Sequence, residues 1–425
     1  MSKFPLAKYM EIQKRGIDPG LFPNEQFYYY TIPDFDEGGI CPTTLGAEIG
    51  SNKFLVDNGS LLISKLNPRI KRVWQVLNDE KLRSISSTEF VVVAPKEQTN
   101  IAYLYYILQS DEVYSRLESE AVGTTNSHVR FKPNSLLCIP AKFPRKRQQE
   151  KIAQILQTID HTIEKTAALI EKYQQIKAGL MHDLFTRGIG ADGKLRPPRE
   201  QAPELYQQTP IGWIPKDWKL KPLEYGLSAP PKNGFSPKEV DSWQDVYVLG
   251  LGCLTRNGFR PIQLKNAPKN ALFSGAKLEV GDFLISRSNT QDLVGLCGIY
   301  YDAGHDAIYP DLMIKLKFNQ HIDGKFLEKY LLSKAVRQRI STIAVGTSGS
   351  MVKINATTLK ALKIVYPEPD EQKSIVEKLQ PIEGQIDSLE IQLNKLMKQK
   401  SGLMHDLLTG KVQVKPNEPE VLDGL

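Results

Sequence analysis

An internal repeat divides the chain into two copies of one unit. The hexapeptide Gly-Leu-Met-His-Asp-Leu begins at Gly179 and again at Gly402, an offset of 402 − 179 = 223 positions. At an offset of 222, Leu-Ile-Ser-Lys at 62–65 pairs with Leu-Ile-Ser-Arg at 284–287, and Glu89 pairs with Asp311. Such self-similarity predicts two structurally alike units. Because the stretches between the matches diverge, we expect two similar frames that carry two different surfaces.

Each copy ends in a stretch with coiled-coil spacing. Apolar residues recur on a 4-3 alternation from Ile152 to Leu184, and adding 223 to each position gives the same seam in the same phase in the second copy. This spacing predicts two long helices with a helical partner. Both seams place a lysine in the same slot, Lys177 and Lys400, which either fixes the pairing register or extends to solvent near a helix end. Pro381 predicts a bend in the second helix.

The rest of each copy has the composition of a mixed α/β domain. Short β-type runs such as Phe-Val-Val-Val at 90–93 accompany one helical candidate at 101–117, and glycines and prolines gather between the copies. The fold class predicted is therefore α+β. The predicted segments are a first globular domain at 1–147, a helix at 148–186, a linker at 187–210, a second globular domain at 211–369, a helix at 370–411 and a polar tail at 412–425.

Composition and charge restrict the partners and the compartment. The chain has 425 residues with 55 basic and 48 acidic side chains, a net charge of +7, which permits a polyanionic partner without requiring one. The first residues have no apolar core like that of a signal peptide, and no run approaches the roughly 18 apolar residues of a membrane span. We therefore expect a cytoplasmic protein with no membrane contact.

The sequence offers no set of residues for catalysis. No phosphate-binding G-x-x-x-x-G-K-[ST] loop is present, and the four cysteines form no C-x-x-C pair. The two His-Asp pairs of the hexapeptides are neighbours in a helix, so their side chains point away from each other. We predict no catalytic residue, no metal site and no cofactor of the chain's own.

The repeated hexapeptide itself needs another explanation. Glycine inside a helix costs about 1 kcal/mol relative to alanine, yet both helices keep it near their ends. The alternatives are helix-end packing and the docking of a partner protein, and docking is favoured. The predicted docking residues are Gly179, Met181, His182, Asp183, Gly402, Met404, His405 and Asp406.

A duplicated reader suits double-stranded DNA. A duplex has dyad axes, so two domains related by a twofold axis meet two half-sites in equivalent geometry. Base edges and phosphates are contacted by Arg, Lys, Asn, Gln, Ser and Thr side chains, in which the repeated loops are rich. The predicted DNA-binding residues are Ser64, Lys65, Asn67, Arg69, Thr124, Thr125, Asn126, His128 and Arg130 in the first copy, and Arg287, Ser288, Asn289, Gln291, Thr347, Ser348, Ser350 and Lys353 in the second.

Together these features resemble the specificity (S) subunits of type I restriction–modification systems. The resemblance covers nearly the whole chain. It includes the repeat, the closing sequence Gly-Leu-Met-His-Asp-Leu-Leu-Thr-Gly at 402–410, the entry Ile-Gly-Trp-Ile-Pro-Lys-Asp-Trp at 211–218, and the path from Ile-Val-Tyr-Pro-Glu-Pro into Asp-Glu-Gln-Lys at 370–373. The first helix departs from this pattern, because it opens with Gln148-Gln149 where the family has Glu-Gln.

The resemblance implies two target-recognition domains separated by two long helices that pair as an antiparallel coiled coil with pseudo-twofold symmetry. Each domain would read one half of an asymmetric bipartite DNA target, without catalysis by the subunit itself. The helices would dock two methyltransferase (M) subunits, which use S-adenosylmethionine, and nuclease (R) subunits, which use ATP and magnesium, are further candidate partners. Two other interpretations stay open: an enzyme with its own site, and a scaffold or inhibitory protein that docks methyltransferase subunits without reading DNA.

Overall fold

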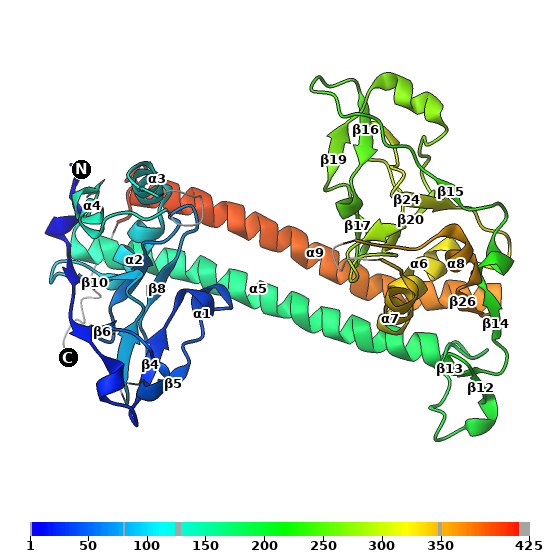
Figure 1. The fold of residues 1–425 in the computed structure, drawn as a ribbon, viewed down its shortest axis with the longest axis horizontal. Helices are drawn as coiled ribbons and strands as arrows, with labels where there is room; N and C mark the ends of the chain where they lie inside the picture. Colours follow the sequence, from blue (N-terminus) through cyan, green and yellow to red (C-terminus); the bar gives the residue numbers. More distant parts are fainter. Residues whose placement is uncertain (1, 80, 124–128, 347–350, 416–425) are drawn as a thin grey trace, which may run out of the picture. The chain divides into compact units, whose positions relative to one another are not determined.

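The computed structural model describes residues 2–79, 81–123, 129–346 and 351–415. The chain forms two compact units. Unit 1 consists of Met1–Ala168 and Ile391–Leu425, and unit 2 of Leu169–Glu390. Each unit contains one globular domain and a part of each of two long helices, α5 (Lys146–Thr186) and α9 (Pro369–Leu408) (Figure 1). The prediction of two long helices is confirmed, and α9 continues through Pro381 as one helix.

The globular domain of unit 1 is built on a four-stranded antiparallel sheet in the order β2-β10-β7-β8. Three helices accompany the sheet, and the first two meet at Ser110, which caps the second by accepting a hydrogen bond from the Val113 backbone N–H. The bounds are β2 (Met10–Gln13), β10 (Phe90–Pro95), β7 (Leu61–Ser64), β8 (Val73–Gln75), α2 (Ile101–Gln109), α3 (Asp111–Ser119) and α4 (Pro133–Cys138).

Unit 2 repeats this frame. Its four-stranded antiparallel sheet has the equivalent order β15-β24-β20-β22. The starts of equivalent helices differ by 324 − 101 = 223 for α6 against α2, the offset of the sequence repeat. The bounds are β15 (Lys232–Asn233), β24 (Met313–Leu316), β20 (Phe283–Ser286), β22 (Cys297–Ile299), α6 (Gly324–Leu332), α7 (Lys334–Ile343) and α8 (Ala356–Ala361).

The two domains differ in a second sheet. In unit 1 five strands lie in the order β3-β6-β9-β4-β5, and in unit 2 three strands lie in the order β19-β16-β23. The three strands of unit 2 repeat the β5-β4-β9 part of unit 1, with one antiparallel and one parallel pairing in each, so unit 1 differs by its two further strands β3 and β6. The expectation of like frames with unlike surfaces is thus met by two shared sheets, the second of which is extended in unit 1. The bounds are β3 (Gly16–Ile17), β6 (Lys53–Val56), β9 (Arg83–Ser86), β4 (Gln26–Tyr30), β5 (Thr43–Leu45), β19 (Leu264–Asn266), β16 (Val246–Leu249) and β23 (Asp306–Ile308).

Short elements complete the two domains. Two-stranded pairs are β1 with β11, β12 with β13, β14 with β26, β17 with β18, and β21 with β25. Their bounds, with the remaining helix, are β1 (Phe4–Pro5), β11 (Pro140–Ala141), β12 (Tyr206–Thr209), β13 (Gly212–Pro215), β14 (Lys219–Pro222), β26 (Lys363–Tyr366), β17 (Leu254–Thr255), β18 (Gly258–Phe259), β21 (Ser288–Asn289), β25 (Val352–Lys353) and α1 (Ile32–Asp36).

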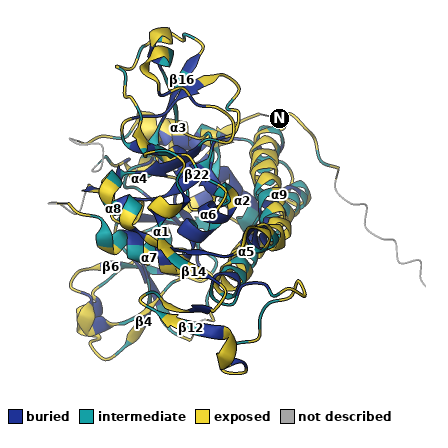
Figure 2. Ribbon diagram, turned by 90° about the vertical axis from the view of Figure 1, so that its right-hand side faces the viewer, coloured by how far each residue is buried: buried dark blue, intermediate teal, exposed yellow. Residues whose placement is uncertain are grey.

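The long helices pair antiparallel within each unit. In unit 1 the start of α5, at Ile152 and Leu156, shares a core with the end of α9, at Leu407 and Leu408. In unit 2 the end of α5 at Leu184 shares a core with the start of α9, from Ile375 to Leu379. Both long helices, α5 and α9, carry exposed and half-buried surface (Figure 2). Residues 171–180 of α5 are all exposed or half-buried.

A buried glutamine joins each globular domain to the helix that follows it. In unit 2 the side chain of Gln372 is fully buried; its Oε1 accepts from the Asp323 backbone N–H at 2.7 Å, and its Nε2 donates to the carbonyls of His321 and Pro367, both at 2.9 Å. Asp323 is also the N-cap of α6. The side chain therefore satisfies three main-chain groups from outside its own helix.

Gln149 makes the same three bonds in unit 1. Its Oε1 accepts from the Asn100 backbone N–H at 2.8 Å, and its Nε2 donates to the carbonyls of Gln98 at 3.2 Å and Pro144 at 2.9 Å. Each partner lies 223 positions before its counterpart in unit 2. All six bonds end on main-chain atoms. We call each set of three bonds the glutamine clamp.

Acidic side chains on the long helices form a second repeated contact. In unit 2 Glu383 lies 2.9 Å from the Nζ of Lys177 and 3.0 Å from that of Lys329, which α6 contributes. In unit 1 the equivalent Asp160 lies 2.6 Å from the Nζ of Lys400 and accepts from the Tyr106 hydroxyl of α2 at 2.7 Å. The seam lysines are thus ion-paired across the coil, which supports the register alternative rather than extension to solvent.

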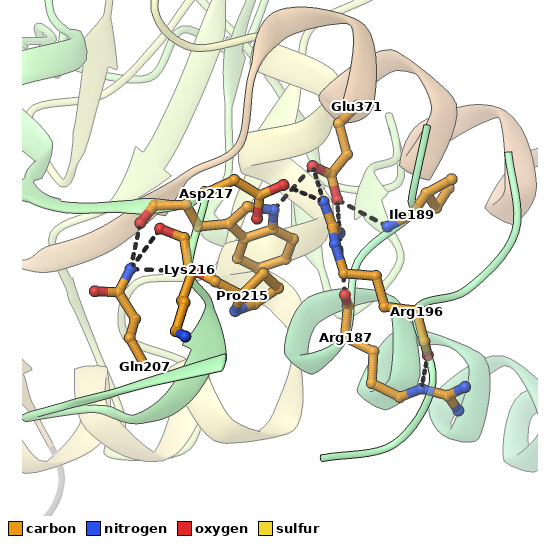
Figure 3. Close-up of polar contacts among 9 residues, drawn as sticks. Arg187, Ile189, Arg196, Gln207, Pro215, Lys216, Asp217 and Glu371 are labelled. Atoms are coloured by element: carbon orange, nitrogen blue, oxygen red, sulfur yellow. Dashed lines mark hydrogen bonds and ion pairs between the residues drawn. The ribbon is translucent and has the colours of Figure 1, made fainter. Parts of the chain in front are cut away.

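The segment after α5 folds back onto the start of α9 inside unit 2. The Arg196 guanidinium contacts the Glu371 carboxylate at 2.5 and 3.1 Å and the Asp217 carboxylate at 2.6 Å, while the Trp218 indole N–H donates to Glu371 at 3.0 Å (Figure 3). Gly188 passes so close that an added Cβ would overlap Glu371, Arg196 and Trp218, and its φ of +65° favours glycine. Ile189 and Arg196, within the segment predicted as a linker at 187–210, are therefore anchored to the start of α9.

Candidate nucleic-acid interface

The structure brings together the two loop segments predicted to bind DNA in each copy. In unit 1 the segment after β7 bridges the segment around Arg130 through Leu66↔Arg130, and in unit 2 β21 pairs with β25 through Ser288↔Lys353. The two pairings are equivalent, because 288 − 66 = 222 and 353 − 130 = 223. In each domain these two segments thus lie side by side where the structure describes them.

Two of the predicted contacts are wrong, because their side chains are buried. Ser64 is 1% exposed and exchanges hydrogen bonds of 3.2 Å with the Leu66 backbone, and Ser288 is likewise 1% exposed. Both lie at or just beyond the end of a central strand, where alternate side chains point into the domain. Asn67 follows at a turn with φ +48°, a conformation that asparagine tolerates better than most residues, and it is half-buried together with Lys65.

In unit 1 the exposed arginines of this surface are held by carboxylates. Arg130 contacts both oxygens of Glu89, at 2.9 and 3.2 Å, and this hydrogen-bonded pairing raises the pKa of the Arg130 guanidinium. Arg69 lies 3.2 Å from Glu118. A DNA phosphate would have to compete with these carboxylates for either arginine.

In unit 2 the counterpart of Arg130 is Lys353, and Arg287 is the counterpart of Lys65. Within the described ranges neither Arg287 nor Lys353 forms an ion pair with a carboxylate. For Lys353 the reason lies in the strand register: the Lys65 N–H bonds the Glu89 carbonyl and the Arg287 N–H bonds the Leu312 carbonyl, so Leu312 occupies the position of Glu89. The alignment of Glu89 with Asp311 is therefore corrected by one residue.

The other predicted residues are partly accounted for. The Gln291 amide donates to the Ser341 carbonyl on α7, and the Asn289 side chain accepts from the Thr290 backbone N–H at 2.9 Å. The predicted residues that lie outside the described part of the chain are Thr124, Thr125, Asn126, His128, Thr347, Ser348 and Ser350.

The residues predicted to dock a partner lie beside a groove in each unit. In unit 1, Met404 and His405 line a groove of about 340 Å³ with Ile107 and Val113, where α2 meets α3. We call it groove 1. In unit 2, Met181 and His182 line a groove of about 1550 Å³ with Tyr330 and Val336, where α6 meets α7; we call it groove 2.

The two grooves are equivalent parts of the repeat, because each lining residue named above lies 223 positions from its counterpart. The hexapeptide glycines contribute differently. A Cβ added to Gly179 or Gly402 would meet no atom within 4 Å, so these glycines are not required by packing among the described residues. Asp183 and Asp406 pair with Arg187 at 3.6 Å and Lys411 at 3.3 Å.

Sequence reasoning missed the contribution of the globular domains to these surfaces. The α2–α3 and α6–α7 junctions that complete the grooves were not predicted, nor was the glutamine clamp. A signal was available, since the repeat aligns Gln149 with Gln372 and Ser110 with Ser333 at the same offset of 223.

The described residues contain neither a candidate metal site nor a candidate membrane-spanning helix. Among the residues that the structure describes, no group of three or more His, Cys, Asp or Glu side chains could hold a metal ion. Within the same described segments, no helix is both long enough and apolar enough to cross a membrane.

Comparison with known proteins places the chain in a family. The model of the type I restriction modification DNA specificity domain matches residues 11–175 and 256–399. The chain is 24% identical over 420 residues to the type I restriction enzyme MjaVIII specificity subunit of Methanocaldococcus jannaschii, covering 94% of this chain and 90% of that protein. It is 22% identical over 325 residues to the EcoKI specificity subunit of Escherichia coli K12, covering 75% and 66%.

Solved structures agree on the fold. The S subunit of a type I restriction–modification system from M. genitalium superposes with a TM-score of 0.53 at 14% identity, over 96% of this chain and 95% of that one. A chain from a structure of type I R-M complex assembly gives the same TM-score at 17% identity, over 96% and 98%. The family model covers well over half of the sequence and both copies of the repeat. The chain therefore belongs to the family of type I restriction–modification DNA specificity subunits.

Proposed function

We propose that this chain is the non-catalytic, sequence-reading subunit of a type I restriction–modification complex. Each globular domain reads one half of an asymmetric, bipartite DNA target. The observation that carries the proposal is the repeated frame, whose second sheet has two further strands in unit 1, inside a chain whose two halves both match the specificity family. One frame with two different surfaces suits two unlike half-sites.

The partners follow from the same reasoning. Two methyltransferase subunits dock at groove 1 and groove 2, where the hexapeptide residues meet the globular domains, and nuclease subunits join the complex through them. S-adenosylmethionine, ATP and magnesium then belong to the partner subunits, and the complex acts on cytoplasmic DNA. Support for docking comes from the repeated Met-His pairs, which line equivalent grooves in the two units.

The proposal is tested by methylation mapping. Co-expression of the chain with its cognate methyltransferase subunit should methylate genomic adenines in a split motif of two unlike half-sites with a fixed gap. Replacing unit 2's globular domain by that of a relative should change one half-site alone. A stable complex that methylates no defined motif would favour the scaffold alternative, and methylation by the isolated chain would favour the enzyme alternative.

Arg287 offers a residue-level prediction for DNA binding. It is half-buried beside β21, and no carboxylate in the described segments neutralises it. Replacing Arg287 by alanine should weaken binding of target DNA by the assembled complex by about tenfold, since a good arginine contact is worth roughly 1–3 kcal/mol. Fluorescence anisotropy with target and scrambled duplexes measures this effect.

The comparison of duplexes identifies the kind of contact. Relaxed specificity at one base pair indicates a base contact, whereas a uniform loss with a salt slope reduced by about one indicates a phosphate contact. Arg69→Ala is the matched control, because Arg69 is already paired with Glu118 and should change affinity much less. Equal effects of the two substitutions would contradict the assignment of Arg287.

A further inference from the structure

Groove 2 carries an excess of positive charge. Five basic side chains line it, against one carboxylate, that of Asp292: Arg256, Lys334, Arg337, Arg339 and Lys363. Ion pairs are common elsewhere in the chain, yet in the described segments none of these five lies within ion-pair distance of a carboxylate. Their charge is therefore left for something outside the chain to neutralise.

Two of these cations are held in place by neutral acceptors. Arg339 donates to the Lys363 carbonyl at 2.9 Å and to the Tyr330 hydroxyl at 3.0 Å, and Arg337 donates to the Asp292 main-chain carbonyl at 3.0 Å. Burial lowers the pKa of the Arg337 guanidinium, and Arg256 lowers it further, whereas Cys297 and Asp292 oppose the shift. The guanidinium groups are thus oriented without being neutralised.

Groove 1 has a much smaller excess, since Lys71, Lys142 and Lys400 line it together with Asp111 and Glu112. Asp111 stands where groove 2 has Lys334, and it is paired with Lys71; Glu112 stands where groove 2 has Ala335, and it is paired with Lys3. Lys400 is paired with Asp160. The two grooves therefore share their shape-giving helices and their Met-His pair but differ in electrostatic character.

The lining of groove 2 favours a protein segment over a nucleic acid. The same groove is also lined by apolar side chains that the described chain leaves accessible or only partly covers, among them Met181, Trp213 and Ile343. A phosphate backbone would neutralise the cations but would leave these apolar groups without a partner. An amphipathic helix with one apolar and one acidic face contacts both kinds of lining at the same time.

We propose that groove 2 binds an acidic amphipathic helix of the methyltransferase subunit through charge complementarity, and that groove 1 binds its methyltransferase subunit without this electrostatic contribution. The inference rests on the proposed function. Its consequence is that the two docking events differ in salt dependence, although the docked subunits are alike. The affinity of groove 2 for the methyltransferase subunit falls steeply as the salt concentration rises, since the charges of its lining side chains are screened.

The test uses the full chain and the purified cognate methyltransferase subunit in isothermal titration at low and physiological salt. Met404→Asp or Met181→Asp disables one groove at a time, so that each site is measured alone. The double substitution Arg256→Glu with Lys334→Glu should weaken the groove-2 site at least tenfold and leave the groove-1 site unchanged. Both side chains are exposed, so the fold does not depend on them.

The matched control is Lys238→Glu with Lys269→Glu, which makes the same charge change at exposed positions of unit 2 that do not line groove 2. Two bound methyltransferase subunits with unaltered affinities in the Arg256/Lys334 variant would overturn the inference and leave the proposed function standing. Loss of DNA affinity with unchanged subunit docking would assign groove 2 to DNA and also overturn it. Failure of the wild-type chain to bind the subunit at all would instead contradict the proposed docking.

Discussion

Replacing Gln372 by leucine should lower the melting temperature of unit 2 by roughly 10 °C. The substitution keeps the volume of the side chain but leaves the Asp323 N–H and the carbonyls of His321 and Pro367 without their partner. A buried polar group that loses its hydrogen bond costs about 1–3 kcal/mol, so three such groups sum to roughly 3–9 kcal/mol, and the expected shift corresponds to the lower part of this range. For a unit of this size each kcal/mol shifts the melting temperature by about 2–4 °C.

Differential scanning calorimetry of the full chain provides the measurement, with Gln392→Leu as control. Gln392 lies on the same helix, is exposed, and forms no side-chain hydrogen bond among the described residues. Gln149→Leu should produce a comparable loss in unit 1 through its own three bonds. Equal behaviour of Gln372→Leu and Gln392→Leu would show that the clamp contributes nothing to stability.

Replacing Glu383 by glutamine should destabilise unit 2 by about 3 kcal/mol. Removing one partner of a buried ion pair leaves the other charge uncompensated, which typically costs 3–5 kcal/mol. The Lys177 and Glu383 side chains are 13% and 18% exposed, and Lys177 has no other carboxylate partner in the described segments, whereas Lys329 retains Glu328 at 3.1 Å. Chemical denaturation of the full chain, followed by circular dichroism, measures the loss.

A double substitution separates the cost of an unpaired charge from the value of the pair. Lys177→Met with Glu383→Leu removes the cross-helix pair together and should recover most of the stability, because apolar replacements of buried pairs are often neutral or stabilising. Asp160→Asn in unit 1 should cost less than Glu383→Gln, since Lys400 and Asp160 are 26% and 23% exposed. A double variant as unstable as Glu383→Gln would argue that the pair itself stabilises the coil.

The same pair gives stability a defined dependence on pH. Burial alone would raise the pKa of Glu383, but Lys329 and Lys177 outweigh it, and the net pKa lies below its ordinary value of 4.5. A carboxylate whose pKa is depressed by folding stabilises the folded state above its unfolded pKa, and that contribution is lost as pH falls through the folded pKa. The wild-type chain should therefore lose, below about pH 4.5, stability that the Glu383→Gln variant already lacks.

Sequence reasoning succeeded where the signal is periodic or repeated. The heptad spacing from Ile152 to Leu184 predicted α5, and the offset of 223 predicted a second helix of the same kind, because helix formation and seam burial depend on spacing along the chain. The α+β class followed from the alternation of β-type runs with one helical stretch. The resemblance to specificity subunits, based on four motifs together, agreed with the family match.

Prediction from the sequence failed where burial and anchoring depend on contacts between residues that are far apart in the chain. The burial of Ser64 and Ser288 follows from which face of the strand meets the core, and a polar residue type does not reveal that face. The anchoring of the segment after α5 depends on Arg196 meeting Glu371, 175 positions away, whereas glycine and proline content alone predicted a linker without its contacts. Lys177 and Lys400 left two alternatives open until their carboxylate partners were located.

The glutamine clamp bears on how such a protein acquires new specificities. Both clamps recognise only peptide N–H and carbonyl groups of the globular domain, so the attachment places no demand on the identity of the side chains it holds. Asn100 and Asp323 stand at equivalent positions and are attached in the same way. At the clamp, a recognition domain can thus change its side chains without losing these bonds, whereas the contacts of Tyr106 with Asp160 and of Lys329 with Glu383 still require particular side chains. Selection for new targets is therefore decoupled from selection for assembly at the clamp, but not at these two contacts.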